Sequence, residues 1–253
     1  MNKKIATFRF YAELNDFLPK DKQKVAFNYI FSGRPTVKDA IEACGVPHPE
    51  VEIILVDDKS VDFAYHINDG ERIAVYPEFE SVDISPLLKL HQQPRRETKF
   101  ILDTHLGKLA RNLRMFGFDV LYAHEFSDQE IITCSLEEKR IILTRDQGLL
   151  KNKEVTHGLW IRCTESENQT TEVIKRLDLL SQIKPLTRCL VCNTLLESVE
   201  KSKIIDKLPP NTKKYYSEYK ICLKCENVYW SGSHYQRMQK KIEKIKKSVQ
   251  GEK

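Results

Sequence analysis

The chain has 253 residues, 41% of them hydrophobic and 30% charged, which excludes a disordered or fibrous protein and allows two or three small domains. No apolar run approaches the length of a membrane span and no secretion signal opens the chain, so we expect a cytoplasmic protein. Residues 188–253 hold 15 Lys and Arg against 7 Asp and Glu, whereas residues 1–85 hold 10 against 15. Positive charge at one end favours a polyanionic partner there, although a solubilising tail would have the same composition.

The first 80 residues are predicted to form one small acidic domain. A helix opens at the Thr36–Asp39 cap and closes at Gly45. Alternating apolar residues predict strands on both sides of this helix, at residues 5–11, 25–31, 51–56, 61–67 and 72–76. Two strands, a helix and further strands in so short a span predict a β-grasp, or ubiquitin-like, domain at residues 1–80.

Two segments of this domain, PTVKDAIEACGV and HINDGERIAVYP, resemble the ubiquitin-like sulfur-carrier proteins of thiamine and molybdopterin synthesis. Those carriers act through a free C-terminal Gly-Gly, which is missing here, so sulfur transfer is disfavoured. An interaction or packing module with a protein partner remains. Apolar residues recur at no regular interval in residues 81–97, which are predicted to be a linker with a short helical piece at 87–90.

Residues 98–183 alternate between strands and helices. Strands are predicted at 100–102, 118–123, 140–144 and 158–163. Helices are predicted from 106 to 116, after the capping box that starts at Ser127, and from 170 to 180. This alternation predicts an α/β domain, a three-layer arrangement in which helices cover both faces of a parallel sheet.

Three acids in this domain are candidate ligands of Mg²⁺ or Mn²⁺. Asp103 and Asp146 directly follow apolar strands, and Asp128 begins the helix between them. Strand ends and helix starts share one edge of such a sheet, so the carboxylates are expected to converge. Asp128 could instead be only a favourable helix-start charge, and Glu130 is explained by the capping box, although it is also a candidate ligand. Nearby cations could hold phosphates: Lys108, Arg111, Arg114 and Arg145.

Four of the seven cysteines form two Cys-x-x-Cys pairs. They are Cys189, Cys192, Cys222 and Cys225, with 29 residues between the pairs. Two such pairs close a tetrahedral Zn²⁺ site with no open position, which predicts a structural zinc ribbon at residues 187–236. A redox role is the disfavoured alternative. Lysines and tyrosines alternate between the pairs and offer phosphate contacts and stacking surfaces, although Trp230 could equally pack beside the zinc.

The chain ends in a basic tail at residues 237–253. It is predicted to be a frayed helix that adds salt-dependent affinity for nucleic acid, and a solvated tail without a role is the alternative.

The segments FILDTHLGKLARNLRMFGFDVLYA, SDQEII and RIILTRDQGLL are similar to the PIN-like RNase family first described at the C-terminus of the Mut-seven exonuclease. RCLVCN and ICLKCENVYWSGSHYQRM resemble that family's zinc ribbon, and a preceding β-grasp domain is a known arrangement in it. The resemblance implies a metal-dependent ribonuclease in which Asp103, Asp128 and Asp146, with Glu130 as a further candidate, bind Mg²⁺ or Mn²⁺. An RNA-binding adaptor with a degenerate nuclease site is the alternative.

Overall fold

The computed structural model describes residues 3–77 and 98–251, which divide into two compact units. The first unit comprises residues 3–77 and 132–160, and the second comprises residues 98–131 and 161–251. The predicted linker at 81–97, with its helical piece at 87–90, lies outside the described residues. Across the described residues, no helix combines the length and the apolar character needed to cross a membrane.

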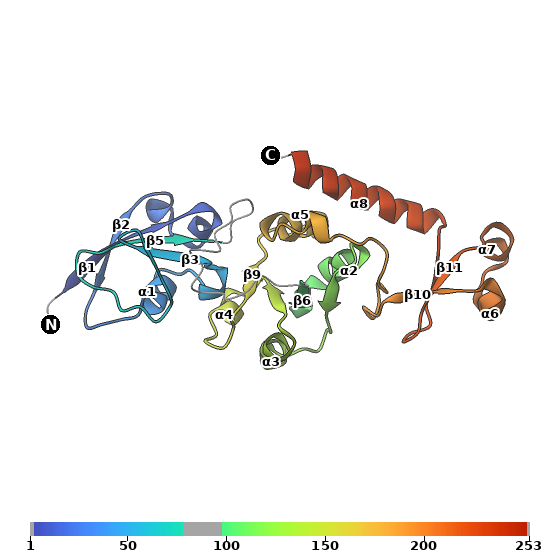
Figure 1. Ribbon diagram of the computed structural model, residues 1–253, viewed down its shortest axis with the longest axis horizontal. Coiled ribbons are helices and arrows are strands. Elements are labelled where there is room, and N and C mark those ends of the chain that lie inside the picture. The colour runs from blue at the N-terminus through green and yellow to red at the C-terminus, as the bar shows by residue number, and fades with distance from the viewer. Residues whose placement is uncertain (1–2, 78–97, 252–253) are drawn as a thin grey trace. The chain divides into compact units, whose positions relative to one another are not determined.

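The β-grasp domain is built on a five-stranded sheet in the order β2-β1-β5-β3-β4. Strands β1 and β5 are parallel, and the other neighbouring pairs are antiparallel. The strands are β1 (Lys4–Phe10), β2 (Phe27–Phe31), β3 (Ile53–Val56), β4 (Lys59–Val61) and β5 (Arg72–Tyr76). Helix α1 (Val37–Ala43) covers one face of this sheet (Figure 1). This arrangement confirms the predicted β-grasp fold.

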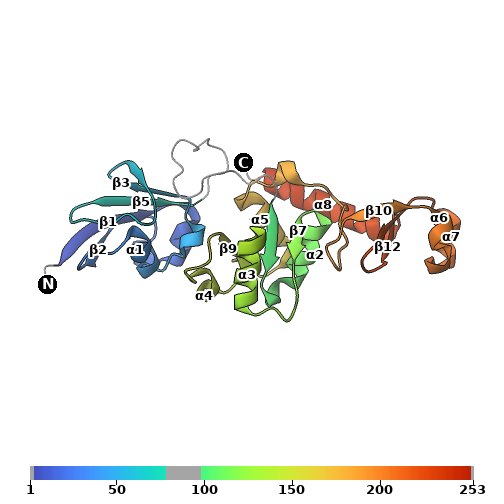
Figure 2. The same cartoon turned by 60° about the horizontal axis from the view of Figure 1, so that its bottom comes forward.

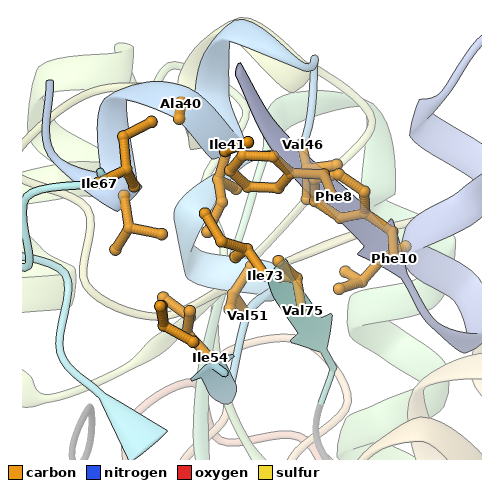
Figure 3. Packing of buried hydrophobic residues seen from close by; sticks show 14 of the residues in the cluster. Phe8, Phe10, Ala40, Ile41, Val46, Val51, Ile54, Ile67, Ile73 and Val75 are labelled. Carbon is orange, nitrogen blue, oxygen red and sulfur yellow. The ribbon is translucent and has the colours of Figure 1, made fainter. Parts of the chain in front are cut away.

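The core of this domain follows from the alternation of β1. Ala6, Phe8 and Phe10 are buried, while the residues between them are more exposed. They pack with Ile41 of α1 and with apolar residues of β3 and β5 such as Ile54 (Figure 3). The predicted cap of α1 is present: the Thr36 hydroxyl accepts the amide of Asp39, and the Asp39 carboxylate accepts the amide of Thr36.

The strand predicted at 61–67 is wrong, because β4 ends at Val61. The carboxylate of Asp62 accepts the amide of Ala64, and its carbonyl accepts the amide of Tyr65. An acidic side chain that bonds its own backbone in this way favours a turn over a strand. Three short 3₁₀ turns complete the domain, at Ala12–Phe17, Lys20–Lys22 and His48–Glu50.

The predicted α/β domain is confirmed as a four-stranded sheet in the order β7-β6-β8-β9. Its parallel pairs are β6 (Lys99–Leu102) with β7 (Asp119–Leu121) and β8 (Ile141–Thr144) with β9 (Gly158–Trp160). Its helices are α2 (Gly107–Met115), α3 (Asp128–Glu138), α4 (Gln147–Leu150) and α5 (Ser166–Arg176), with 3₁₀ turns at Thr104–Leu106 and Leu180–Gln182. Helix α5 thus begins and ends four residues earlier than predicted.

Gly117 ends α2 and fixes the path of the chain toward the cysteines. Its φ of +95° is in the left-handed region, where only glycine is free of strain. A Cβ at this position would lie 2.0 Å from the carbonyl oxygen of Lys184. The segment after α5 therefore packs directly on the end of α2, and the amide of Leu186 donates to the carbonyl of Met115.

The cysteine-rich region is a small antiparallel sheet in the order β10-β11-β12. Its strands are β10 (Leu196–Val199), β11 (Tyr219–Cys222) and β12 (Val228–Trp230). Two short helices, α6 (Lys201–Ile204) and α7 (Pro210–Tyr215), with a 3₁₀ turn at Ile205–Lys207, fill the connection between β10 and β11 (Figure 1). The sheet and its four cysteines match the predicted zinc ribbon.

The predicted tail is not frayed but forms the 19-residue helix α8 (Ser233–Gly251). Its apolar residues Ile242, Ile245 and Val249 are buried, and α8 lies along α5 in both views (Figures 1 and 2). Lys241 and Lys244 of α8 both pair with Glu167 at the start of α5. The basic helix therefore packs on α5 within the second unit. The alternative of a tail that is solvated along its whole length is excluded.

Candidate functional site

The four cysteines of the two Cys-x-x-Cys pairs meet in space. Sulfur–sulfur distances are 3.4 Å for Cys189 and Cys225, 3.2 Å for Cys192 and Cys222, and 3.5 Å for Cys192 and Cys225. All four sulfurs lie within 4.8 Å of one another. Four sulfurs at the usual Zn–S distance around one tetrahedral ion are about 3.8 Å apart, so the arrangement fits Zn²⁺ and leaves no ligand position open.

Both cysteine pairs are shaped by the same backbone turn. The fourth residue after the first cysteine, Asn193 in one pair and Glu226 in the other, donates its amide to that cysteine's carbonyl, at 3.0 and 2.8 Å. Both residues have positive φ, 71° and 57°. The two turns therefore present their sulfurs in the same way, and β10 and β11 bring them together.

Polar groups surround three of the four sulfurs. The Tyr229 hydroxyl lies 3.1 Å from the sulfur of Cys189, the Asn227 side-chain amide donates to Cys225 at 3.1 Å, and the Thr194 hydroxyl lies 3.4 Å from Cys192. Such contacts orient thiolate ligands and lower their charge density. They identify Tyr229, Asn227 and Thr194 as supporting residues that the cysteine spacing alone does not reveal.

The thiol pKa values reflect this crowding. Burial raises the pKa of Cys225 to about 12, and the neighbouring cysteines add to the rise. Burial also acts to raise the pKa of Cys192, but hydrogen bonds with Thr194, together with those to Cys222 and Cys225, outweigh it and lower that pKa to about 6. Without a cation, four adjacent thiols cannot all lose their protons, whereas Zn²⁺ binds all four as thiolates.

Arg114, predicted to contact RNA, is buried beside the first cysteine pair. Its side chain is only 5% exposed, and its guanidinium donates to the carbonyls of Val120 and Val191, the latter at 2.7 Å. Val191 lies inside the first cysteine pair, so Arg114 ties α2 to the zinc site. A zinc ion with four thiolates carries net negative charge, which a nearby guanidinium offsets. These bonds account for the buried guanidinium of Arg114, and its predicted contact with RNA stays a prediction.

A second polar link joins β7 to the same cysteine pair. Asp119, the first residue of β7, pairs with Arg188 at 3.3 Å and accepts the side-chain amide of Asn193 at 2.9 Å. Asn193 in turn accepts the amide of Val120 through its side-chain oxygen. Asp119 therefore anchors the ribbon to the sheet.

The candidate acids Asp103 and Asp146 occupy equivalent places in the sheet. Asp103 directly follows β6, is 9% exposed, and precedes the 3₁₀ turn Thr104–Leu106, where its carboxylate accepts the hydroxyl of Thr104 at 3.1 Å. Asp146 follows β8 and caps α4, where its carboxylate accepts the amide of Gly148 at 2.7 Å. Each therefore stands where a strand opens into a helical turn, as the sequence predicts.

Asp128 and Glu130 both lie in the first turn of α3 and are exposed. Glu130 accepts the backbone amide and the hydroxyl of Ser127, and these hydrogen bonds lower its pKa. The capping box thus accounts for Glu130 as the sequence suggests. Asp128 is left with its carboxylate in solvent at the N-terminus of α3.

Within residues 3–77 and 98–251, only the four cysteines form a group of three or more potential metal ligands within 4.8 Å of one another. The side chains of Asp103, Asp128, Asp146 and Glu130 make up no such group there. Of the predicted phosphate-binding cations, Lys108, Arg111 and Arg145 are exposed.

Comparison with known families gives two matches. Residues 98–242 match the family described as Mut7-C RNAse domain, and residues 3–83 match the one described as Mut7-C ubiquitin. The chain belongs to the Mut7-C RNAse domain family. This membership, with its ubiquitin-like first domain, supports a nuclease-like function that involves RNA. Neither the curated proteins nor the solved structures contain a match to the chain.

The Mut7-C region also carries a groove of about 930 Å³ beside the ribbon sheet. Its lining combines aromatic and cationic side chains, among them Arg111, Lys220, Tyr229, Trp230, His234 and Tyr235. Trp230 also packs against the small ribbon core of Ile204, Leu208 and Tyr219. Trp230 thus serves the packing role considered from sequence and also lines the groove.

Proposed function

We propose that this Mut7-C protein is a metal-dependent ribonuclease that hydrolyses RNA phosphodiester bonds, with Asp103, Asp128 and Asp146 as ligands of Mg²⁺ or Mn²⁺ and Glu130 as a further candidate. The observation that carries the proposal is the position of Asp103. Burial of a carboxylate at the end of an apolar strand costs free energy unless the charge is paired, hydrogen-bonded or bound to a metal. Asp103 is nine-tenths buried and accepts the hydroxyl of Thr104, and a metal ion would compensate its charge further. Asp146 also directly follows a strand, β8, although it is exposed.

In this proposal the carboxylates bind the metal and the cations bind phosphate. Carboxylate oxygens suit hard cations such as Mg²⁺ and Mn²⁺, which activate water and neutralise charge on a phosphodiester when bound. Lys108, Arg111 and Arg145 are exposed cations that would hold the flanking phosphates. Gly148 places its amide, and no side chain, beside the carboxylate of Asp146. The oxygen of Asp146 that this amide does not use remains available to a cation.

The zinc ribbon and α8 would hold the RNA. The ribbon groove offers aromatic rings to unpaired bases and cations to phosphates. Helix α8 buries its apolar stripe and leaves lysines such as Lys240 and Lys247 exposed. Binding through such contacts weakens steeply as salt rises, because it releases counterions from the RNA.

The test is cleavage of a panel of single-stranded and structured RNAs with Mn²⁺, comparing the wild type with Asp103→Asn and Asp146→Asn. Each substitution should lower the cleavage rate by at least about 100-fold, because loss of a metal ligand removes several kcal/mol of transition-state stabilisation. Asp178→Asn, at an exposed acid after α5, is the matched control and should cleave as the wild type does.

An RNA-binding adaptor is the second candidate. It is favoured by the exposure of Asp128 and Glu130 and by the finding that, in residues 3–77 and 98–251, no three acids lie within 4.8 Å of one another. This alternative predicts salt-dependent RNA binding by the wild type without cleavage of any substrate. Equal cleavage by wild type, Asp103→Asn and Asp146→Asn would instead place the activity elsewhere.

A further inference from the structure

The first unit contains a contact between the β-grasp domain and the segment that leads into β9. The Glu50 carboxylate accepts the backbone amide of Trp160. The ring of Phe17 packs on the ring of Trp160, with centroids 4.9 Å apart and planes inclined by 40°. His48 adds a third contact through Nε2, which lies 2.6 Å from the carbonyl oxygen of Val155.

These contacts are buried and supported from within the β-grasp domain. Glu50 is 5% exposed and His48 is 4% exposed. The other ring nitrogen of His48 lies 2.6 Å from the carboxylate of Glu42 on α1, and its ring packs edge-on against Phe63. Buried polar groups of this kind are retained only where their partners are present, so the contact is specific rather than a loose encounter.

The same contact reaches the loop that carries Asp146. The indole nitrogen of Trp160 donates to the carbonyl of Arg145 at 3.3 Å. Trp160 also pairs in register with Thr144, the last residue of β8. The Thr144 hydroxyl in turn accepts the amide of Asp146 at 2.8 Å. The peptide group between Arg145 and Asp146 is therefore bonded at its carbonyl to Trp160 and at its amide to Thr144, the residue that pairs with Trp160.

We propose that the β-grasp domain acts within its own chain as a clamp that positions the Arg145–Asp146 loop. Glu50 and Phe17 fix Trp160, and Trp160 fixes the carbonyl of Arg145. Glu50 and Trp160 are thus positioning residues for Asp146, and this role rests on the proposed metal-binding function of Asp146. It gives the ubiquitin-like domain a use that requires no Gly-Gly terminus, because the clamp uses the turns around Phe17 and Glu50.

The physical basis is preorganisation. A ligand held in one position before the ion arrives loses less conformational freedom on binding than one on a loose loop. Loss of one hydrogen bond in the clamp should therefore weaken metal binding by about threefold to tenfold, the range that one typical hydrogen bond supplies.

The experiment compares full-length wild type with Glu50→Ala and Trp160→Phe. Glu50→Ala removes the acceptor for the Trp160 amide, whereas Trp160→Phe keeps an aromatic ring beside Phe17 and removes the indole donor together with the second ring of the indole. Glu50→Gln, whose side-chain oxygen can still accept, should behave as the wild type does. Asp21→Ala, at an exposed acid of the same domain, controls for loss of charge.

Two readouts separate the clamp from the proposed function. Hydrogen exchange of the Asp146 and Gly148 amides in metal-free protein reports the clamp alone, and it should speed up in Glu50→Ala and Trp160→Phe but not in Glu50→Gln. Mn²⁺ binding, measured by electron paramagnetic resonance, should weaken threefold to tenfold in the same two variants, as one lost hydrogen bond predicts.

Unchanged exchange in Glu50→Ala would overturn the clamp. Faster exchange with unchanged Mn²⁺ affinity would overturn its positioning role. If the wild type and Asp146→Asn bound Mn²⁺ equally, the proposed function would fail and the positioning role with it, whereas the exchange data would still decide whether the two parts are clamped.

Discussion

The β-grasp domain and the zinc ribbon obtain their stability in opposite ways. The β-grasp domain has a core of 16 buried apolar residues, from Ala6 to Val75. The ribbon core has three, Ile204, Leu208 and Tyr219, with a rim of half-buried neighbours. Burial of apolar surface can hold the first domain together without a ligand, whereas the ribbon needs other sources of free energy. Zinc at the four cysteines would be the main one, because the free energy of metal binding becomes free energy of folding.

The ribbon also depends on the α/β domain beside it. Arg114 of α2 donates to the carbonyl of Val191 between two zinc ligands, and Asp119 of β7 pairs with Arg188. Helix α8 continues the chain beyond the ribbon and packs on α5. The ribbon therefore has four attachments: a metal ion at the cysteines, the bond from Arg114 to Val191, the pair of Arg188 with Asp119, and α8. Each can be removed separately.

The largest effect is expected from loss of zinc. Chelation, or Cys222→Ser, should unfold β10 to β12 and leave the β-grasp domain folded. Structural zinc sites contribute about 10 kcal/mol or more of apparent binding free energy, which far exceeds what three buried residues can replace. Zinc content by mass spectrometry and hydrogen exchange resolved by segment would check both halves of this expectation.

Cys134→Ser is the matched control, since this half-buried cysteine of α3 is not among the zinc ligands. If the ribbon amides stayed protected from hydrogen exchange after complete removal of metal, the small apolar core would be enough to keep the ribbon folded. That result would contradict the proposed difference between the ribbon and the β-grasp domain.

The converse change is Ile54→Ala in the β-grasp core. Ile54 of β3 is fully buried, so its truncation should lower the free energy of unfolding of that domain by about 2–5 kcal/mol through lost burial and a residual cavity. Ile30→Ala at a 59% exposed position of β2 removes the same atoms and should cost less than about 0.5 kcal/mol. Denaturant unfolding followed by segment-resolved exchange would measure both.

Zinc content should not change in either variant. If Ile54→Ala loosened the ribbon as much as the β-grasp domain, the two regions would not be separate in stability.

The sequence was sufficient to predict those features of the structure that depend on residues close together in the chain. The alternation of Ala6, Phe8 and Phe10, the cap at Thr36 and the cysteine spacing each depend on neighbours a few residues away, and all appear in the structure. The strand ends at Asp103 and Asp146 were also predictable, because an acid directly after an apolar run is visible in sequence.

Features that depend on distant partners were not predictable. Arg114 has the spacing of an exposed helix position, yet two of its hydrogen-bond partners, the carbonyls of Leu190 and Val191, lie 76 and 77 residues further along the chain. The apolar stripe of α8 is short and lies among lysines: Ile242, Ile245 and Val249. The sequence of this segment therefore indicates a charged tail, and only its contact with α5 in the structure shows that the stripe is buried. The contact of Glu50 with Trp160 spans 110 residues and has no local signal.

Arg114→Lys should have the next largest effect on the ribbon. A lysine keeps the charge but cannot reproduce the forked donation to the carbonyls of Val120 and Val191. We expect a loss of about 1.5–3 kcal/mol, the usual range for buried hydrogen bonds that involve a charged group. Thermal unfolding and competition with a zinc chelator would show lower stability and faster metal release.

Arg111→Lys, one turn of α2 earlier and exposed, is the control and should leave both quantities as in the wild type. An unchanged rate of zinc release in Arg114→Lys would show that the bond from Arg114 to the carbonyl of Val191 does not support the metal site.

The smallest effect is expected at the ion pairs that join α8 to α5. The Lys244 hydrogen bond is the main cause that lowers the pKa of Glu167, and Lys241 adds to it. A carboxyl with a lower pKa in the folded than in the unfolded chain stabilises the fold above its unfolded pKa and loses that contribution as pH falls through the folded pKa. Because Glu167 is 40% exposed and Lys244 is 75% exposed, solvent screening limits Glu167→Gln to less than about 1 kcal/mol.

Exchange of the α8 amides near pH 7 should therefore speed up slightly in Glu167→Gln, and the difference from the wild type should shrink in high salt and disappear in acid. Ile245→Ala removes a buried side chain from the same helix and should loosen α8 far more, at every salt concentration. If Glu167→Gln released α8 as fully as Ile245→Ala did, the ion pairs of Glu167 rather than the apolar stripe would hold this helix on α5. The attachment of the ribbon through α8 would then be mainly electrostatic.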